Sequence, residues 1–392
     1  MSKLEQLINE LCPNGVEYKT LGEIGKFTRG NGLQKKDFVD TGKPVIHYGQ
    51  IYTKYNFSTN ITHSFTEEEV FKKLRKAKKN DILIATTSEN VKDVAKCVVW
   101  LGEEEIGFSG DMYSFSTQEN SKYIAYYFQT NYFQKQKELK VTGTKVMRIH
   151  SNDMEKFEIP LPPLPVQEEI VRILDTFTEL TTELTTELTM RKQQYEYYSK
   201  KLFNFNNSVK LSKLADIANI GTGSSNTNEQ LEVGDYPFFV RSQEIRRKNE
   251  YEFDETAIIT SGDGVGVGKI FHFVSGKYAL HQRAYRINIT DSNIIPKYFF
   301  YYMKNMFYEY ILKSAYSSSV TSIRRPMLNN FYVPLPPLEE QQRIVDILDR
   351  FDALVNDIKD GLPAEIEARQ KQYEYYRDKL LTFKKNEKIM ER

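Results

Sequence analysis

Apolar side chains recur every three or four residues along two long stretches of the chain. In the first stretch, after Val166, they are Ile170, Ile173, Leu174, Phe177, Leu180, Leu184, Leu188, Tyr195, Tyr198 and Leu202. In the second they include Ile344, Ile347, Leu348, Phe351, Leu354, Ile366, Tyr373, Tyr376 and Leu380. This spacing places them on one face of a helix, and each stretch follows a Pro-rich LPPL segment that cannot form a helix interior. The pattern predicts two long helices, the first over 166–203 and roughly 57 Å long at ~1.5 Å per residue.

The two stretches belong to an internal repeat. The segment IPLPPLPVQEEIVRILDTF (159–177) matches VPLPPLEEQQRIVDILDRF (333–351), and RKQQYEYYSKKLF (191–203) matches RQKQYEYYRDKLL (369–381). Weaker matches precede them, among them Gly30 with Gly223 and Gln50 with Gln243. The chain is therefore two diverged copies of one unit, each a variable block followed by a helical block.

A helix this long with a single apolar seam is not stable alone, so the two helices should pair as a coiled coil. The second helix leaves the second variable block, so pairing requires it to run antiparallel to the first. We predict an α+β protein: two globular heads separated by a pair of long antiparallel coiled-coil helices, with an internal pseudo-twofold repeat. The predicted boundaries are 1–160 for head 1, 161–205 for the first spacer helix, 206–335 for head 2 and 336–392 for the second spacer helix.

Two local features modify the helices. Residues 178–189 read TELTTELTTELT, and four residues of helix correspond to ~6 Å of length. We hypothesise that this repeat sets a distance between the heads; the alternative is repeat slippage without a role. In the second helix, Gly361-Leu362-Pro363 should produce a kink or divide it in two.

Each variable block mixes short β-like runs with one aromatic-rich helix. The strands are expected near 81–87 and 96–101 in head 1, and near 256–260 and 269–274 in head 2. The helices are expected over 121–139 and 296–312. The glycine-rich segment 262–268 is interpreted as a flexible turn and strand, the counterpart of the segment that begins at Thr87.

Polar side chains able to contact DNA gather in the turn-like segments of both heads. Arginine can bind guanine and glutamine can bind adenine in bidentate fashion, whereas a surface hydrogen bond is the alternative role for each of them. The candidates are His47, Tyr48, Gln50, Thr87, Ser88, Lys145 and Arg148 in head 1, and Arg241, Ser242, Gln243, His281, Gln282, Arg283, Ser319 and Arg324 in head 2. A basic run from Lys72 to Lys79 could in addition follow the phosphate backbone.

Composition narrows the class of protein. The 392 residues are 40% hydrophobic and 27% charged, with a net charge of +1, which is typical of a globular chain and not of a polyanion-binding tail. We expect a cytoplasmic protein, because there is no signal-peptide layout or long apolar run, and two cysteines cannot form a disulfide framework. Nucleotide-binding, nuclease, hydrolase and metal motifs are absent; Gly262-DGVGVG fails the G-x-G-x-x-G pattern. The sequence predicts a chain without catalytic activity, bound cofactor or metal.

The alternation of two variable blocks with the I-P-L-P-P-L…Q-x-x-I-V-x-I-L-D-x-F and R-x-x-Q-Y-E-Y-Y helices closely resembles the specificity (S) subunits of type I restriction–modification enzymes. The resemblance covers essentially the whole chain. It implies that each head is a target-recognition domain for one half of a bipartite DNA site, while the helices set the gap between the halves. The TELT run also resembles the tetrapeptide repeats in the spacer helix of some members.

The resemblance further implies partners for the helices and the DNA. Double-stranded DNA, two methyltransferase (M) subunits and two restriction (R) subunits are expected, and no membrane. S-adenosylmethionine, ATP and Mg²⁺ would be used by those partner subunits. The candidate M-docking residues are Gln167, Ile170, Tyr195, Tyr198, Gln341, Ile344, Tyr373 and Tyr376. Three alternatives remain open: a complex that only methylates, a coiled-coil scaffold whose heads bind proteins, and a fragment of a fused methyltransferase–nuclease.

Overall fold

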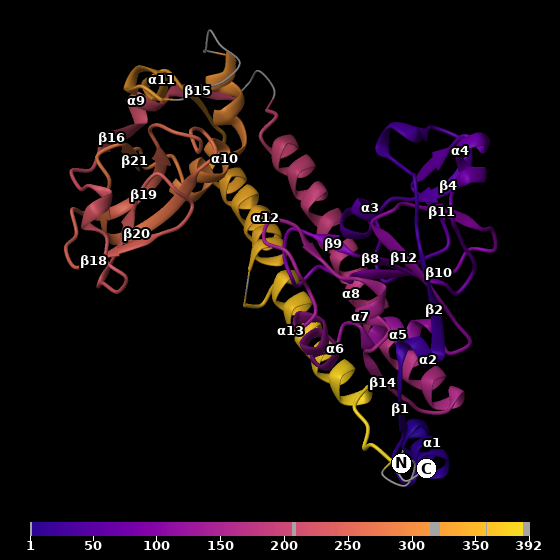
Figure 1. The fold of residues 1–392 in the computed structure, drawn as a ribbon. Helices are drawn as coiled ribbons and strands as arrows, with labels where there is room; N and C mark the ends of the chain where they lie inside the picture. Colours follow the sequence, from indigo (N-terminus) through magenta and orange to yellow (C-terminus); the bar gives the residue numbers. More distant parts are fainter. Residues whose placement is uncertain (1, 206–208, 314–321, 358, 387–392) are drawn as a thin grey trace. The chain divides into compact units, whose positions relative to one another are not determined.

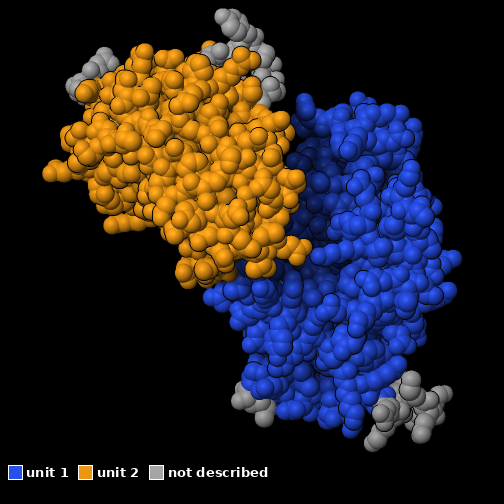
Figure 2. All heavy atoms as spheres, turned by 90° about the vertical axis from the view of Figure 1, so that its left-hand side faces the viewer, with its two compact units in different colours: residues 1–183, 366–392 blue, residues 184–365 orange. Residues whose placement is uncertain are grey.

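The computed structural model describes residues 2–205, 209–313, 322–357 and 359–386 (Figure 1). The chain forms two compact units, one of residues 1–183 and 366–392 and the other of residues 184–365 (Figure 2). Unit 1 contains head 1 and unit 2 contains head 2, and each unit includes parts of both helical blocks.

The strands of head 1 form two five-stranded sheets, with orders β2-β12-β8-β10-β5 and β3-β6-β4-β11-β7. Their bounds are β2 (Gly25–Arg29), β3 (Phe38–Val39), β4 (Lys43–Ile46), β5 (Ser58–Thr59), β6 (Ser64–Thr66), β7 (Lys76–Ala77), β8 (Ile82–Ala85), β10 (Cys97–Trp100), β11 (Ile106–Phe108) and β12 (Met112–Thr117). Two antiparallel pairs complete the head: β1 (Glu17–Thr20) with β14 (Glu158–Leu161), and β9 (Thr87–Ser88) with β13 (Met147–Arg148). Its helices are α1 (Lys3–Leu11), α2 (Leu21–Ile24), α3 (Tyr48–Thr53), α4 (Glu68–Lys73), α5 (Ser121–Tyr127), α6 (Asn131–Glu138) and α7 (Ser151–Met154).

Head 2 has one six-stranded sheet, of order β16-β21-β19-β20-β17-β18. The strands are β16 (Ala218–Thr222), β17 (Tyr236–Phe239), β18 (Arg246–Lys248), β19 (Phe253–Ser261), β20 (Phe271–Leu280) and β21 (Ala284–Ile289). The pair β15 (Lys210–Lys213) with β22 (Tyr332–Leu335) corresponds to β1 with β14, and the helices are α9 (Leu214–Ile217), α10 (Pro296–Lys313) and α11 (Arg325–Asn329). Strand β20 pairs with β19 and then with β17. In head 1 the corresponding pairings are made by two strands, β10 with β8 and β11 with β4. The change of partner falls between Tyr278, which pairs with Phe253 of β19, and Ala279, which pairs with Phe238 of β17.

The predicted spacer helices are confirmed, including the break in the second. Helix α8 (Leu164–Leu202) is continuous over 39 residues, whereas the second block forms α12 (Leu338–Asn356) and α13 (Leu362–Leu380). In unit 1, Phe177 of α8 stacks on Tyr376 of α13 at 5.6 Å between ring centroids. In unit 2, Tyr195 of α8 lies 6.2 Å from Phe351 of α12. Because the first half of α8 meets the later helix and the second half meets the earlier one, the pairing is antiparallel.

The strands predicted from both heads are present as β8, β10, β19 and β20, and α10 matches the expected helix over 296–312. The single helix expected over 121–139 is wrong: this segment forms α5 and α6. The hydroxyl of Thr130 accepts a hydrogen bond from the N–H of Phe133 and caps a new helix at that point. An apolar pattern that continues through both helices does not register such a break.

A buried glutamine joins each head to its helix. The side-chain oxygen of Gln167 accepts the N–H of Asn120 at 3.1 Å, and its amide donates to the carbonyl of Pro162 at 2.8 Å. In the second copy, Gln341 accepts the N–H of Ile295 and donates to the carbonyl of Pro336, both at 2.9 Å. Both glutamines are fully buried, so backbone groups take the place of water as partners of their side-chain amides.

An aspartate further along each helix makes a second set of hydrogen bonds to the head. Asp175 accepts hydrogen bonds from Lys122 and from the hydroxyl of Tyr126, both at 2.7 Å. Asp349 accepts the equivalent bonds from Lys297 at 2.8 Å and from Tyr301 at 2.5 Å. The glutamine and the aspartate of each repeated segment therefore fasten a head to its helix; together with the lysine and tyrosine that bind the aspartate, we call them the head–helix joint.

Candidate nucleic-acid interface

Backbone hydrogen bonds bring together loops of head 1 that are far apart in the sequence. The N–H of Ser109 donates to the carbonyl of Ile46 at 3.2 Å, which places the β11–β12 turn beside the end of β4. The N–H of Thr86 donates to the carbonyl of Asp111 at 3.0 Å, and the N–H of Ile149 donates to the carbonyl of Thr86 at 3.1 Å. The loops that carry His47, Thr87 and Arg148 thus form one cluster around residues 109–111.

His47 and Gln50 organise the first of these loops. The Nδ1 atom of His47 accepts the N–H of Gly49 at 3.2 Å, and Gln50 accepts the N–H of His47 at 3.0 Å. The amide of Gln50 also donates to the hydroxyl of Ser64 at 2.7 Å. Burial, and secondarily the charge of Lys35, lowers the pKa of His47, so its ring is neutral and suited to accept. Both candidates therefore support the loop, and His47 together with Tyr48 also lines the pocket described next.

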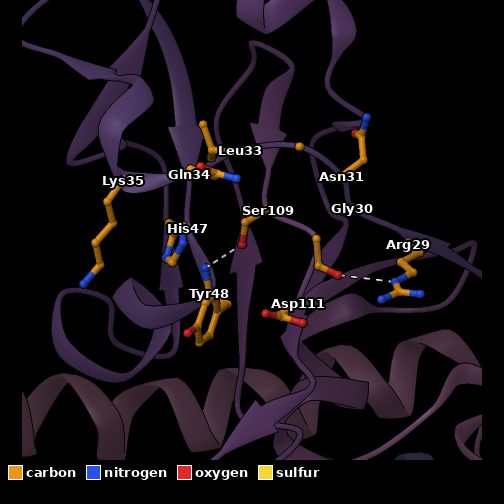
Figure 3. Close-up of a pocket in the computed structure, with 12 residues that line it drawn as sticks. Arg29, Gly30, Asn31, Leu33, Gln34, Lys35, His47, Tyr48, Ser109 and Asp111 are labelled. Carbon is orange, nitrogen blue, oxygen red and sulfur yellow. Dashed lines mark hydrogen bonds between the residues drawn. The ribbon is translucent and has the colours of Figure 1, made fainter.

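A pocket of about 630 Å³ lies within this loop cluster (Figure 3). Tyr48 lines it together with Arg29, Lys35 and Asp111. The N–H of Tyr48 donates to the hydroxyl of Ser109 at 2.9 Å, which fixes the start of α3 against the turn. Arg29 and Asp111 were missed in the sequence because their place at the pocket depends on loops that are distant along the chain, such as the one that begins at His47. The pocket presents both a cation and an anion, as a site for base edges would.

The other candidates of head 1 lie on β9 and β13. Thr87 is paired with Arg148 across the two strands, and the hydroxyl of Tyr52 donates to the carbonyl of Thr87 at 2.8 Å. Ser88 is half-buried and its hydroxyl accepts the N–H of Asn90 at 3.5 Å. Arg148 and Lys145 are exposed, Lys145 on the turn that leads into β13. The pairing of β13 with β9 therefore places two cations beside the loop cluster.

In head 2, equivalent backbone hydrogen bonds bring the loops together. The N–H of His281 donates to the carbonyl of Phe239 at 2.9 Å, that of Gly262 to Arg283 at 2.9 Å, and that of Ile323 to Gly262 at 2.8 Å. Strand registers agree: Tyr113 pairs with Arg29 in head 1, and Tyr285 pairs with Thr222 in head 2. The expected correspondence between residues 262–268 and the segment from Thr87 agrees with these bonds. The strand expected within 262–268 is wrong, since these residues form a turn between β19 and β20.

The side chains at corresponding backbone positions differ between the heads. Positions 48, 87 and 111 carry tyrosine, threonine and aspartate in head 1, and their counterparts are Arg241, Asp263 and Arg283. Asp263 accepts hydrogen bonds from Arg241 at 2.6 Å and from Arg283 at 3.3 Å. The hydrogen bond from Arg241 is the main cause of the lowered pKa of Asp263, so the carboxylate stays ionised.

The remaining candidates of head 2 surround this cluster. His281 is buried, and its Nδ1 atom accepts the N–H of Arg283 at 3.0 Å; burial, then the charges of Arg241 and Arg283, lower its pKa. The hydroxyl of Ser242 donates to the carbonyl of Glu244 at 3.0 Å, and Gln282 donates to Asn226 at 2.5 Å. Gln243 and Arg324 are exposed, and Ser319 lies outside the described residues.

The basic run of head 1 is partly neutralised. Lys72 is paired with Glu69 at 3.2 Å and Lys78 with Glu105 at 3.6 Å, while Lys79 pairs with Glu103. Exposed pairs of this kind cancel much of the field that would attract phosphate. This part of the run is therefore a weaker candidate for DNA contact than the loop cluster.

The candidate docking residues of the helices fall into buried and exposed groups. Gln167, Ile170, Gln341 and Ile344 are fully buried beneath their own heads, so their side chains offer no surface to a partner. Tyr373 is buried and donates to Gln129 at 2.8 Å, and Tyr195 is half-buried. Tyr198 and Tyr376 are exposed by 41% and 37%, and their neighbours Tyr197 and Tyr375, missed in the sequence, by 62% each. The second and third tyrosines of each Y-E-Y-Y segment thus form an exposed pair.

Comparisons with known proteins agree with this organisation. The family model described as the type I restriction modification DNA specificity domain matches twice, over residues 13–191 and 206–368. The Escherichia coli type I restriction enzyme EcoR124I/EcoR124II specificity subunit is 33% identical to this chain, over 99% of each. The chain belongs to the family of type I restriction–modification DNA specificity subunits.

Solved structures share the fold. A type I restriction–modification S subunit from M. genitalium superposes with a TM-score of 0.60 at 16% identity, covering 94% of this chain and 96% of that one. A chain from a study of complex assembly and conformational transition of the type I R-M system gives a TM-score of 0.61 at 16% identity, with 94% and 97% covered. Among the described residues, none of the helices is both long and apolar enough to cross a membrane.

Proposed function

We propose that each head of this chain reads one half of a bipartite DNA sequence, and that the chain itself catalyses no reaction. The observation that carries the proposal is the loop cluster of each head, built by the same backbone hydrogen bonds but lined with different side chains. A common frame with exchanged polar groups is suited to present two different patterns of donors and acceptors to base edges. The two half-sites should accordingly differ in sequence.

We further propose that the helices set the gap between the half-sites and dock two M subunits, with two R subunits completing the complex. The exposed tyrosine pairs, Tyr197 with Tyr198 and Tyr375 with Tyr376, support docking because large amphipathic rings are frequent in protein interfaces. Both pairs occur at equivalent places in the repeat, as expected if two copies of one partner bind. Methyl transfer from S-adenosylmethionine, and any ATP- and Mg²⁺-dependent cleavage, belong in this proposal to the partner subunits.

The test is long-read methylome sequencing of cells that co-express this chain with the methyltransferase encoded beside it. We expect N6-methyladenine on both strands of a single split motif, and no such motif with the methyltransferase alone. Methylation equal to the methyltransferase-only control would contradict the proposal and favour a protein-binding scaffold. A methylated motif in cells that carry an R subunit, without cleavage of unmodified DNA, would favour the methylation-only complex.

A further inference from the structure

Head 2 contains a cluster of three charged side chains from three loops. Arg241 follows β17, Asp263 follows β19, and Arg283 lies in the turn between β20 and β21. The Nη1 atom of Arg241 donates to Oδ1 of Asp263 at 2.6 Å, and Nη1 of Arg283 donates to Oδ2 at 3.3 Å. Each oxygen of one carboxylate therefore holds one guanidinium group.

The backbone fixes this cluster in place. The N–H of Gly262 donates to the carbonyl of Arg283 at 2.9 Å, and the hydroxyl of Ser261 donates to the carbonyl of Asp263 at 2.7 Å. The turn that carries Arg283 is closed by its N–H, which donates to Nδ1 of His281. The loops are held in position without a ligand, so binding costs little ordering of the backbone.

The cluster faces solvent, with side-chain exposures of 40% for Arg241, 29% for Asp263 and 61% for Arg283. Exposed ion pairs contribute little to stability, so stability does not explain why two arginines share one carboxylate. A guanidinium has five N–H donors, and the bond to Asp263 occupies one of them. An arginine held in this way can still present two N–H groups side by side to a pair of acceptors.

We propose that Asp263 is a specificity-determining residue of head 2, which positions Arg241 and Arg283 to read guanine in the half-site bound by this head. The inference rests on the proposed function, since it requires a DNA duplex as ligand. Guanine presents N7 and O6 side by side in the major groove, the pair of acceptors that a guanidinium fork matches. A carboxylate between the two arginines disfavours the phosphate group, the other acceptor that arginine commonly binds, because like charges repel.

The same backbone positions of head 1 carry Tyr48, Thr87 and Asp111, which cannot form an arginine–carboxylate–arginine cluster. This manner of guanine recognition is therefore assigned to head 2 alone, and head 1 serves as the internal control in every variant of head 2.

The experiment uses the chain in complex with its methyltransferase. The methylome of the wild type supplies the site, and the head-2 half-site is the one unaffected by Arg148→Ala in head 1. Competition binding then compares duplexes with each of the four bases at every position of that half-site. The wild type should require guanine on one strand at one or two positions. Asp263→Asn should lower this preference about tenfold, as the loss of one bidentate contact would, and leave the other half-site unchanged.

Two further variants separate base reading from folding and from net charge. Arg283→Lys keeps the charge of an exposed side chain but removes the fork, so the guanine preference should fall while general affinity for DNA is retained. Asp254→Asn makes the same change as Asp263→Asn at an exposed position of β19, the strand that precedes Asp263, opposite Lys277, and should alter neither the guanine preference nor the general affinity for DNA. Thermal unfolding of each variant and an unchanged head-1 half-site report an intact fold.

Either of two results would overturn the inference: a head-2 half-site without a G·C pair, or variants that weaken binding to all bases equally, as loss of a phosphate contact would. A wild-type complex that methylates no split motif is a different failure, because it contradicts the proposed function and not the role of Asp263.

Discussion

Head 1 and head 2 share one backbone frame but differ in how their strands are divided between sheets. In head 1 the strands β10 and β11 belong to two sheets, whereas in head 2 the single strand β20 serves both pairings. The loop cluster has the same backbone hydrogen bonds in both heads, yet its corresponding side chains are Tyr48, Thr87 and Asp111 in one and Arg241, Asp263 and Arg283 in the other. Backbone bonds do not depend on side-chain identity, so the frame can stay fixed while the side chains of the loop cluster change.

The head–helix joint shows the opposite behaviour. Gln167 and Gln341 make the same two hydrogen bonds in their own units, as do Asp175 and Asp349. Here side chains bond buried backbone groups, and a substitution would leave those groups without a partner. The molecule therefore varies where side chains face solvent and repeats itself where they satisfy buried groups.

The largest effect is expected from changing only the distance between the heads. Deleting Thr182 to Thr185 removes one four-residue unit from α8 and ~6 Å of helix, nearly two base pairs at ~3.4 Å each. Methylation of the original site should be lost, and a site with the same two half-sites and a shorter gap should replace it. Methylome sequencing gives the answer directly, and an unchanged gap would show that the TELT run does not set the spacing.

The joint can be broken in one copy at a time. Gln341→Ala leaves the N–H of Ile295 and the carbonyl of Pro336 without partners, which should destabilise unit 2 by about 2–4 kcal/mol. Gln167→Ala should do the same to unit 1. Urea unfolding followed by hydrogen exchange would locate each loss, with Gln342→Ala as the matched control because its exposed side chain bonds Asp346 on its own helix. If either substitution reduced hydrogen-exchange protection equally in both heads, the two joints would not be independent of each other.

Two arginines test whether each head acts on its own half-site. Arg148→Ala should weaken binding at the head-1 half-site by about 1–3 kcal/mol, because Arg148 lies opposite Thr87 at the loop cluster. Arg324→Ala should weaken the head-2 half-site less, since Arg324 precedes α11 and contributes at most a phosphate contact of smaller size. Footprinting of each half-site measures both changes. A substitution that weakens both half-sites would mean that the heads are not independent readers.

The smallest expected effect is a decrease in stability at low pH, which should occur in both heads. The pKa values of His47 and His281 are lowered, so as the pH falls through about 6.5 the unfolded chain takes up protons before the folded one. The free energy of unfolding should therefore fall with decreasing pH, by no more than about 1.4 kcal/mol per pH unit for each histidine. Thermal unfolding between pH 8 and 5.5 measures this decrease. His47→Asn and His281→Asn should each make this decrease with pH shallower.

Most of the helical architecture could be predicted because its causes are local or repeated. A 3.6-residue period over about ten turns and two matching segments leave little freedom to the chain, and Gly361 with Pro363 marks the helix break. The break between α5 and α6 could not be predicted, since it depends on a single threonine hydroxyl inside a continuous apolar pattern.

The candidate site was predictable only in part. The turns that carry His47, Thr87, Arg241 and His281 were recognisable, but the carboxylates Asp111 and Asp263 were not singled out. Their importance comes from partners far along the chain, such as Arg241 for Asp263, and no local pattern records such contacts. The separation between counterparts also changes along the heads, from 193 residues for Gly30 and Gly223 to 172 for Asp111 and Arg283, which conceals the correspondence.

The head–helix joint also has a genetic consequence. The gene encodes the same glutamine–aspartate segment twice, at 159–177 and at 333–351, on the C-terminal side of each head. Homologous recombination between genes of this kind that crosses over within either segment would exchange a whole head while restoring a complete joint. New pairs of half-sites would then arise by reassortment of existing heads, without passing through an unstable intermediate protein.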